Sequence, residues 1–338
     1  MNALVLAPFS KPALDRLGQR LKVTYESWME TKKLYSPQEL IERIRGEGLE
    51  VLVVEADFVQ RDVLEKADKL RLLGVCRADT NLVDLQAATE HGVVVVNTPA
   101  RNAVAVAELA IGLMLSVARR IPVAHTMVSS HQWTDPMMAY MSFRGSELTG
   151  KTIGIVGFGA IGRQVAKRLG AFDTTILVYD PYVPGDEIRS LNGRPEDLDR
   201  LMAESDVVTL HIPVTPETMG LIDARRIEMM KPAACLVNTA STYVVDGNAV
   251  AKALREKRIA GAAFDVFDAW PARADDPLLE MDNVVLTPHI GGATWETIER
   301  YSMMIADDIE RFLDGERPVN LCNSEVWNGQ VRQSRSGG

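Results

Sequence analysis

The sequence has few cysteines, no long apolar run and no excess of positive charge. Its three cysteines, Cys76, Cys235 and Cys322, lie far apart and form no Cys-x-x-Cys or Cys/His pattern. This spacing argues against a disulfide framework and against a zinc site, so we expect reduced thiols and no metal. No apolar run approaches the roughly 18 residues of a membrane helix, and the first residues do not resemble a secretory signal. We therefore expect a cytoplasmic protein that does not bind a membrane.

The charge balance excludes a further class of partner. The formal net charge is −9 and the pI is near 5.2, and no basic stripe is available to phosphates. We therefore expect no nucleic acid as a partner, although a small anionic substrate is still allowed because local charge decides that. Hydrophobic residues make up 46% of the 338 residues and charged residues 25%, which is typical of a globular protein with room for two domains.

Short apolar runs alternate with helical stretches in two successive blocks. The predicted strands of the first block are 2–6, 22–25, 51–54, 72–75 and 93–97, with helices near 11–21, 36–47, 61–66 and 85–91 between them. The predicted strands of the second block are 152–156, 175–179, 207–210, 234–238, 259–264 and 284–286. Such alternation predicts parallel sheets covered by helices on both faces, and six strands in the second.

A glycine motif in the second block indicates a binding site for a dinucleotide. The strand at 152–156 continues into Gly157-x-Gly159-x-x-Gly162 and then into a helix, which is the order that places a pyrophosphate against bare backbone and a helix N-terminus. The next strand ends in Asp180, about 20 residues beyond the glycines, where a carboxylate can accept hydrogen bonds from ribose hydroxyls. A glycine turn in some other α/β protein is the alternative. The order of elements favours a nicotinamide-dinucleotide binder.

The two blocks predict an α/β fold of two doubly wound parallel-sheet domains, a flavodoxin-like small domain and a Rossmann domain, joined by two long helices. The helices are expected at 102–119 and 294–313. The small, substrate-binding domain is then discontinuous, with residues 1–101 and 290–338, and the dinucleotide domain comprises 102–289. Ligands of open α/β sheets bind at the carboxyl ends of strands, so we expect a cleft bordered by these ends.

The stretch 125–146 is expected to be irregular and to contact a partner subunit. It contains four methionines together with Trp133 and Tyr140, and it is too apolar for a solvated loop. Packing on its own domain is the alternative, but adaptable Met and aromatic side chains suit interfaces, which favours a homodimer. The tail 331–338 is expected to be disordered.

Several motifs together resemble one enzyme family. They are VGFGAIGR at 156–163, VYDPY at 178–182, LHIPVTPETMGLI at 210–222, MMKPAACLVNTA at 229–240, GAAFDVFD at 261–268 and NVVLTPHIGGAT at 283–294, with the run 75–119. In this order they resemble the D-isomer-specific 2-hydroxyacid dehydrogenases, the group that includes 3-phosphoglycerate dehydrogenase. The resemblance implies two domains that close on NAD, a homodimer formed through the dinucleotide domain, and reversible hydride transfer between NAD(H) and a small 2-hydroxy or 2-oxo acid.

The resemblance also implies a set of cofactor-binding residues. Asp180 matches the ribose-binding carboxylate, which disfavours the 2′-phosphate of NADP, and Asp265 matches the residue that holds the nicotinamide carboxamide. His211 is equally well explained as a loop histidine with local hydrogen bonds. The full set is Gly157, Gly159, Ala160, Ile161, Gly162, Asp180, His211, Pro213, Thr239, Asp265, His289 and Gly291.

The catalytic positions depart from the family pattern. Members carry an Arg after Asn-x-Ala, where this chain has Ser241, and a Glu before the Pro that follows Asp-Val-Phe, where it has Trp270. The expected acid/base, His289 of Thr-Pro-His, is present. A Ser hydroxyl has neither the charge nor the bidentate fork of an Arg, and an indole cannot raise the pKa of a histidine as a carboxylate does. We therefore expect His289 to be mostly neutral at pH 7 and to favour the role of a base.

Two arginines are candidates to replace the missing positive charge. Arg77 follows the strand 72–75, in a loop that contacts the substrate carboxylate in the family, and Arg101 precedes the first long helix. Either could instead be a surface residue that pairs with Asp79 or Glu108. The candidate catalytic set is therefore His289, Ser241, Trp270, Arg77 and Arg101.

Three functions remain open. The first is an NAD-dependent oxidoreductase whose site accepts an atypical 2-hydroxy acid or a sugar-acid-like substrate, with His289 as acid/base. The second is a catalytically silent NAD(H)-binding regulatory protein, which the loss of Arg and Glu favours. The third is an enzyme that uses NAD transiently for a net non-redox reaction.

Overall fold

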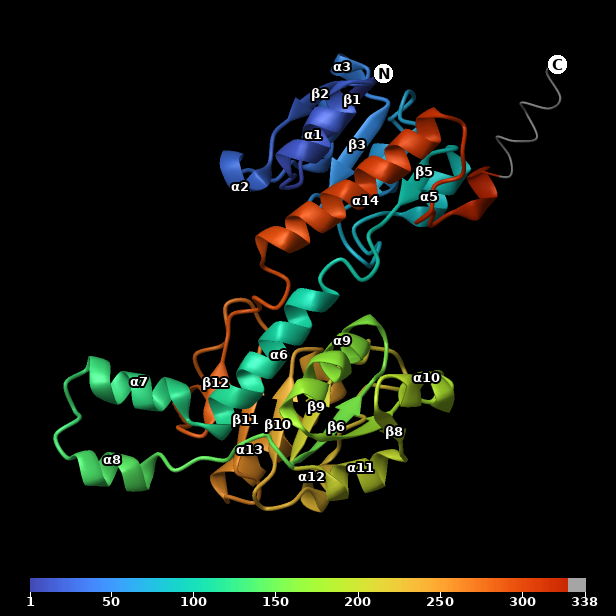
Figure 1. Cartoon of the computed structure of the whole chain (residues 1–338). Helices are drawn as coiled ribbons and strands as arrows, with labels where there is room; N and C mark the ends of the chain where they lie inside the picture. The colour runs from blue at the N-terminus through green and yellow to red at the C-terminus, as the bar shows by residue number, and fades with distance from the viewer. Residues whose placement is uncertain (328–338) are drawn as a thin grey trace. The chain divides into compact units, whose positions relative to one another are not determined.

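The computed structural model describes residues 1–327, so the expectation for the tail 331–338 lies outside the described residues. The chain forms two compact units: unit 1 contains Met1–Arg101 and the chain from Thr294 onward, and unit 2 contains Asn102–Ala293. Each passage from one unit to the other is followed directly by a long helix, α6 (Ala103–Ala118) in unit 2 and α14 (Trp295–Leu313) in unit 1 (Figure 1).

Unit 1 is built on a five-stranded parallel sheet with the order β2-β1-β3-β4-β5. Its central strands are rich in Val and Leu and are almost fully buried on both faces, as expected for a parallel sheet between two helix layers. Helices α3 to α5 cover one face, and α1 and α14 cover the other. The strands are β1 (Asn2–Val5), β2 (Lys22–Tyr25), β3 (Val51–Val54), β4 (Leu72–Val75) and β5 (Val94–Val96), and the remaining helices are α1 (Lys11–Gly18), α2 (Trp28–Thr31), α3 (Pro37–Glu47), α4 (Arg61–Leu64) and α5 (Leu85–Glu90).

Unit 2 is built on a seven-stranded parallel sheet with the order β12-β11-β10-β9-β6-β7-β8. The prediction of six strands was wrong, because the edge strand β8 (Gly193–Pro195) has the sequence Gly-Arg-Pro and offers no apolar run to recognise. An edge strand tolerates the Pro because one side of it makes no ladder. The eleven predicted strands are all present to within two residues; those of unit 2 are β6 (Thr152–Val156), β7 (Thr175–Tyr179), β9 (Val207–Leu210), β10 (Cys235–Asn238), β11 (Gly261–Phe264) and β12 (Val284–Leu286).

Helices cover both faces of the unit 2 sheet, and each face has its own hydrophobic core. Helices α6 and α9 pack with one core, and α11, α12 and α13 pack with the other. The predicted fold class, two doubly wound parallel-sheet domains of flavodoxin-like and Rossmann type, is confirmed by the two strand orders. The helices of this unit that follow α8 are α9 (Ala160–Leu169), α10 (Gly185–Ser190), α11 (Leu198–Glu204), α12 (Ala224–Met229) and α13 (Gly247–Arg255).

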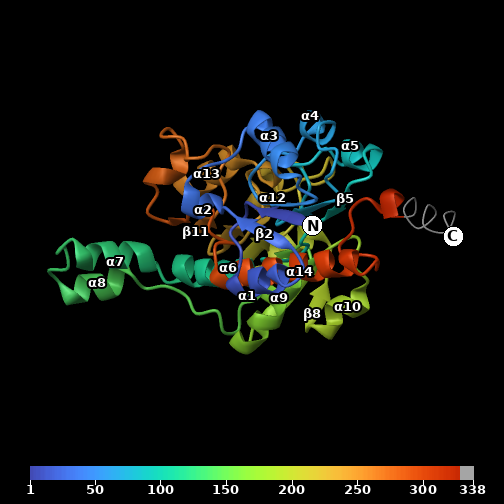
Figure 2. The same ribbon diagram turned by 90° about the horizontal axis from the view of Figure 1, so that it is seen from above.

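The stretch 125–146 is not irregular, so that prediction was wrong. It contains part of α7 (Ile121–Ser129) and all of α8 (Pro136–Ser142), which extend away from the unit 2 sheet in both views (Figure 1, Figure 2). Each helix has a Pro in its first turn, and the Asp135 carboxylate caps α8 by accepting the N–H of Met137 at 2.8 Å. The apolar residues do not follow a regular helical stripe, which is why periodicity did not find these helices.

Within residues 1–327, the three cysteines form no disulfide. Burial raises the pKa of the Cys76 thiol well above its usual value, which agrees with the side chain packing as a small apolar group. In the same part of the chain no helix is both long enough and apolar enough to cross a membrane.

Candidate active site

The carboxyl edge of the unit 2 sheet gathers the predicted cofactor residues. All seven strands are parallel, so the residues that follow them lie along one edge of the sheet. The strand order reverses between β6 and β9, which is the point where open α/β sheets bind ligands. The residues placed along this edge are Gly157 after β6, Asp180 after β7, His211 after β9, Thr239 after β10, Asp265 after β11 and Thr287 to Gly291 after β12.

The glycine loop between β6 and α9 requires its glycines for different reasons. Gly157 has φ +93°, and a Cβ on it would lie 2.5 Å from the carbonyl oxygen of His211. A Cβ on Gly162 would lie 2.1 Å from the carbonyl oxygen of Gly157, so this glycine allows the helix to pack against the turn. A Cβ on Gly159 would meet no described atom within 4 Å, so this backbone borders open space at the start of α9. The loop therefore fits a pyrophosphate held by N–H groups of the first helical turn.

The predicted cofactor residues in that first turn are Ala160 and Ile161, and Asp180 fixes the loop from the neighbouring strand. Its carboxylate accepts the backbone N–H of Phe158 at 2.7 Å and that of Tyr182 at 2.9 Å. A carboxylate has about four acceptor positions, so Asp180 can hold the loop and still accept from ribose hydroxyls. The structure thus gives Asp180 a second role that the sequence motif does not state.

Two buried polar atoms on this edge have no partner among the described residues: Thr239 Oγ1 and His211 Nδ1. The other ring nitrogen of His211, Nε2, lies 3.0 Å from the Thr209 hydroxyl, and burial lowers the pKa of His211 to about 3. The ring is therefore neutral at physiological pH, and its bond to Thr209 agrees with a locally hydrogen-bonded loop histidine. Pro213 is exposed on the same loop and its carbonyl accepts the Thr218 hydroxyl at 2.6 Å. The unpartnered Thr239 hydroxyl fits a polar group of a bound dinucleotide.

Asp265 organises the loop that carries His289. The carboxylate is almost fully buried and accepts hydrogen bonds from the Thr287 hydroxyl at 2.6 Å, the Ile290 N–H at 2.8 Å and the Gly291 N–H at 2.7 Å. A Cβ on Gly291 would lie 2.9 Å from the Asp265 carboxylate, so this close approach needs a glycine. His289 has φ +55°, a left-handed conformation that is uncommon for a residue with a side chain. The three hydrogen bonds that Asp265 accepts hold the loop in this conformation.

Trp270 lies against His289. The two ring centroids are 4.3 Å apart with an angle of 55° between the planes, and the indole is 68% exposed. Both rings border a pocket of about 430 Å³ whose other walls are Phe267, Ala269, Pro271, Ala272, Leu286, Thr287 and Pro288. One side of the His289 ring therefore meets the aromatic surface of Trp270.

The Ser241 side chain caps a turn of its own loop. Its hydroxyl accepts the N–H of Tyr243 at 3.2 Å and so begins the short 3₁₀ helix Thr242–Val244. Asn238 supports the same turn: its side-chain oxygen accepts the N–H of Ala240 at 3.0 Å, and its side-chain nitrogen donates to the Ser241 carbonyl at 2.8 Å. Sequence reasoning did not single out Asn238, although its place at the end of a buried strand indicates such a role.

The two candidate arginines lie in unit 1 and differ in environment. Arg77 is part exposed and its Nε lies 3.4 Å from Asp79, the pairing expected for a surface residue. Arg101 is only 17% exposed, and its Nη1 lies 3.3 Å from Glu55 Oε1. No sequence motif indicates this ion pair. Glu108, the other expected partner, pairs with an arginine of unit 2. Sequence analysis did not name Glu55. Its position directly after strand β3, at the carboxyl end of a parallel strand, is the signal that indicates a site residue.

Comparison with known proteins gives three findings. The family described as "D-isomer specific 2-hydroxyacid dehydrogenase, NAD binding domain" matches residues 111–291. A protein of Bacillus subtilis named "Putative 2-hydroxyacid dehydrogenase YoaD" is 37% identical over 324 residues, which are 95% of this chain and 93% of that protein. The D-3-phosphoglycerate dehydrogenase of Methanocaldococcus jannaschii is 41% identical over 288 residues, 85% of this chain, and the match spans only 53% of that longer protein.

A solved structure extends the likeness to the fold. The TT0316 protein from Thermus thermophilus superposes with a TM-score of 0.80 at 34% sequence identity, and the match covers 95% of this chain and 99% of that one. The likeness therefore includes both units and does not stop at the glycine motif.

Proposed function

This chain belongs to the D-isomer specific 2-hydroxyacid dehydrogenase family and is an oxidoreductase that uses a nicotinamide dinucleotide; on that premise we propose that it transfers a hydride between NAD(H) and an atypical 2-hydroxy acid or sugar-acid-like compound. The observation that carries the proposal is the loop of His289, which Asp265 holds with three hydrogen bonds on the same sheet edge as the glycine loop. We propose His289 as the acid/base.

The cofactor, when bound, supplies or accepts the hydride at the carbon that becomes or was the alcohol carbon. In the direction of reduction, that carbon receives two electrons and one hydrogen, and the proton that completes the hydroxyl comes from the His289 imidazolium. In the direction of oxidation the neutral imidazole takes this proton from the hydroxyl.

The substrate carboxylate needs a cation that position 241 does not provide. Ser241 uses its hydroxyl to cap a turn, and Trp270 contributes only an aromatic wall. Arg77 and Arg101 are the proposed anchors. A guanidinium binds a carboxylate through two parallel N–H bonds, which also polarises an adjacent carbonyl.

Removal of the histidine tests the proposal. Proton transfer by a positioned side chain accelerates a reaction typically ~10²–10⁴-fold, so His289→Ala should lower turnover by that factor. Turnover is followed by NADH absorbance over a panel of 2-oxo acids, 2-hydroxy acids, sugar acids and neutral alcohols. His91→Ala, in unit 1, is the matched control and should leave the rate unchanged. A substrate whose turnover survives His289→Ala would contradict the assignment.

A second candidate is a catalytically silent NAD(H)-binding regulatory protein. The observation that favours it concerns the two residues that stand where the family has Arg and Glu. Ser241 caps a turn and Trp270 packs against the His289 ring, so both make contacts within their own unit. This candidate predicts tight NADH binding by calorimetry with no turnover of any panel member.

We propose that the arm formed by α7 and α8 joins two copies of the chain into a homodimer. Met137, Met138, Tyr140 and Met141 of α8 are all exposed, and a cluster of large apolar side chains on a surface marks an interface. The double substitution Met138→Glu with Tyr140→Asp should convert a dimer into a monomer in light scattering. A monomeric unsubstituted protein at micromolar concentration would refute the proposal.

We also propose a cytoplasmic location. The support is the three unpaired cysteines in the described part of the chain, which suit a reducing compartment.

A further inference from the structure

Unit 1 has its own point of strand reversal, and a pair of buried charges lies there. In the order β2-β1-β3-β4-β5, the chain moves outward from β1 to β2 and then returns to the other side of β1 as β3. Sheets of this order bind ligands outside the carboxyl ends of their first and third strands. Glu55 is the first residue after β3. The topology therefore places its carboxylate where a ligand of unit 1 is expected.

Glu55 is bonded to a cation on one oxygen and to a neutral donor on the other. Arg101 Nη1 lies 3.3 Å from Oε1, and the indole N–H of Trp28 donates to Oε2 at 3.3 Å. Burial raises the pKa of Glu55 in spite of the nearby Arg101. Each carboxylate oxygen has two acceptor positions; the Trp28 indole occupies one position on Oε2, and Arg101 forms an ion pair beside Oε1, so both oxygens keep acceptor capacity. No step proposed above uses this carboxylate.

Arg101 keeps donors available although it is paired. Its contact with Glu55 uses one nitrogen of a group that has five N–H donors, and its guanidinium lies 5.1 Å from the ring centroid of Tyr301. The Tyr301 hydroxyl donates to the Pro8 carbonyl at 2.7 Å, which fixes the ring under the cation. The backbone carbonyl of Arg101 accepts a hydrogen bond from Arg300. The guanidinium is thus held in place and can still bind a carboxylate.

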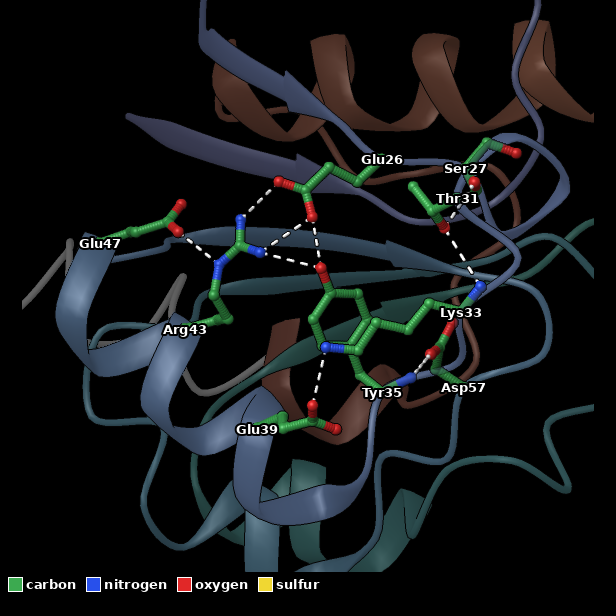
Figure 3. Close-up of polar contacts among 9 residues, drawn as sticks. All are labelled: Glu26, Ser27, Thr31, Lys33, Tyr35, Glu39, Arg43, Glu47 and Asp57. Atoms are coloured by element: carbon green, nitrogen blue, oxygen red, sulfur yellow. Dashed lines mark hydrogen bonds and ion pairs between the residues drawn. The ribbon is translucent and has the colours of Figure 1, made fainter.

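The segment that presents Trp28 is anchored at both of its ends. Ser27, which is fully buried, caps α2 by accepting the Met29 N–H at 3.2 Å. Beyond α2, the N–H of Tyr35 donates to Asp57 at 2.7 Å (Figure 3).

The Tyr35 hydroxyl completes this second anchor. It donates to Glu26, and Arg43 donates both to the Tyr35 hydroxyl and to Glu26, each at 2.9 Å (Figure 3). The hydrogen-bonded ion pair with Arg43 is the main reason why the pKa of Glu26 falls to about 2. The anchors order the segment, so the indole of Trp28 is positioned beside Glu55 before any ligand binds.

We propose that Glu55 and Arg101 form a subsite for a hydroxylated monocarboxylic acid, in which Arg101 binds the carboxylate and Glu55 accepts a hydrogen bond from a further hydroxyl of the substrate. This inference rests on the proposed function and names its substrate class. A carboxylate accepts from a hydroxyl but repels a second carboxylate or a phosphate. The subsite therefore selects for sugar-acid-like compounds and against dicarboxylic and phosphorylated acids.

The test compares two probes that differ by one hydroxyl. Hydroxypyruvate and pyruvate are reduced with NADH by the full-length protein, and the measured quantity is the ratio of their kcat/KM values. A hydrogen bond to a charged group is worth enough to give a ratio of about tenfold or more in favour of hydroxypyruvate. Glu55→Gln, which keeps the size but loses the charge, should lower this ratio at least about fivefold and raise the relative rate with oxaloacetate. Glu30→Gln, an exposed position on α2, is the matched control and should leave the ratio unchanged.

The outcomes separate the subsite from the proposed function. If Glu55 only positioned Arg101, Glu55→Gln would lower both rates equally and leave the ratio intact, which would overturn the proposal. If no probe is turned over, calorimetry of D-glycerate and D-lactate binding to the NADH complex supplies the same comparison without chemistry. A glycerate preference that Glu55→Gln removes would support the subsite in a silent protein, and equal binding of the two acids by the unsubstituted protein would refute it.

Discussion

Asp265 offers the sharpest test of how this site is built, because its carboxylate holds three donors at once. In Asp265→Ala the Thr287 hydroxyl and the N–H groups of Ile290 and Gly291 lose their acceptor. A buried donor left unsatisfied costs about 1–3 kcal/mol, and relief of the buried charge offsets part of the sum. We therefore expect a loss of about 3 kcal/mol in the free energy of unfolding, which leaves a domain of ordinary stability folded.

The same substitution should also lower turnover, because it changes the position of His289. Its left-handed backbone, φ +55°, is a conformation that costs on the order of 1–3 kcal/mol and persists only where its surroundings impose it. Without the bonds from Asp265 the loop should relax, and turnover should fall nearly as far as in His289→Ala, ~10²-fold or more. Asp265→Asn keeps one acceptor oxygen, so we expect an intermediate loss in both measurements.

Urea unfolding and NADH-linked kinetics measure the two effects on the same preparations. Asp268→Ala is the matched control, since Asp268 is exposed three residues along the same segment and should change the free energy of unfolding by less than about 0.5 kcal/mol. The reasoning would be refuted if Asp265→Ala unfolded within about 1 kcal/mol of the unsubstituted protein, a threshold of one ordinary hydrogen bond. Full turnover in a folded Asp265→Ala protein would refute the link to His289.

Three further predictions concern the cofactor, pH and the replaced residues. NAD(H) should bind at least about tenfold more tightly than NADP(H), a gap of about 1.4 kcal/mol, and Asp180→Ala should narrow it; equal affinities in calorimetry would contradict the role of Asp180. Burial lowers the pKa of His211 to about 3, so the unfolded chain takes up this proton first and stability should fall as the pH drops from about 6.5 towards 3. His211→Gln should flatten that part of the stability profile, and an unaltered profile would show that another group causes it. Ser241→Arg with Trp270→Glu should weaken turnover of the true substrate and raise activity on simple 2-oxo acids, and no change in either rate would show that these positions do not shape the pocket.

The sequence was sufficient for the fold because buried strands and packed helices leave periodic apolar patterns. It failed where that pattern is missing. The edge strand β8 has three residues and no apolar run, and the helices α7 and α8 expose the apolar residues that a helix normally buries. The strand β8 depends on its pairing with β7, which local sequence does not show, and the start signals of α7 and α8 are a Pro in each first turn and the Asp135 cap, which an analysis of apolar periodicity does not use.

The candidate site divides in the same way. The glycine loop could be predicted because its spacing reflects contacts between sequence neighbours, such as that between Gly157 and Gly162, although the contact between Gly157 and His211 is visible only in the structure. Glu55 could not be predicted, because its partners Trp28 and Arg101 are 27 and 46 residues away in the sequence. Only the folded structure of unit 1 brings the three side chains together. Asp265 was singled out only by its resemblance to a carboxamide-binding residue, while the three hydrogen bonds that it accepts from the loop of His289 are visible only in the structure.

These bonds bear on whether the protein is an enzyme or a silent binder. A dinucleotide can be held by the glycine loop, Asp180 and Thr239, none of which requires His289 in a left-handed conformation. A strained backbone that its surroundings impose is more readily explained by a role for the residue it positions than by cofactor binding alone. If the loop serves only to bind NADH, neither the unsubstituted protein nor Asp265→Asn should turn over any compound of the panel. Asp265→Asn should then lower only the affinity for NADH. If His289 transfers a proton, the same substitution should lower kcat far more than NADH affinity. A loss of kcat that exceeds the loss of NADH affinity would therefore support an enzyme, and no turnover in either the unsubstituted protein or Asp265→Asn would support a silent binder.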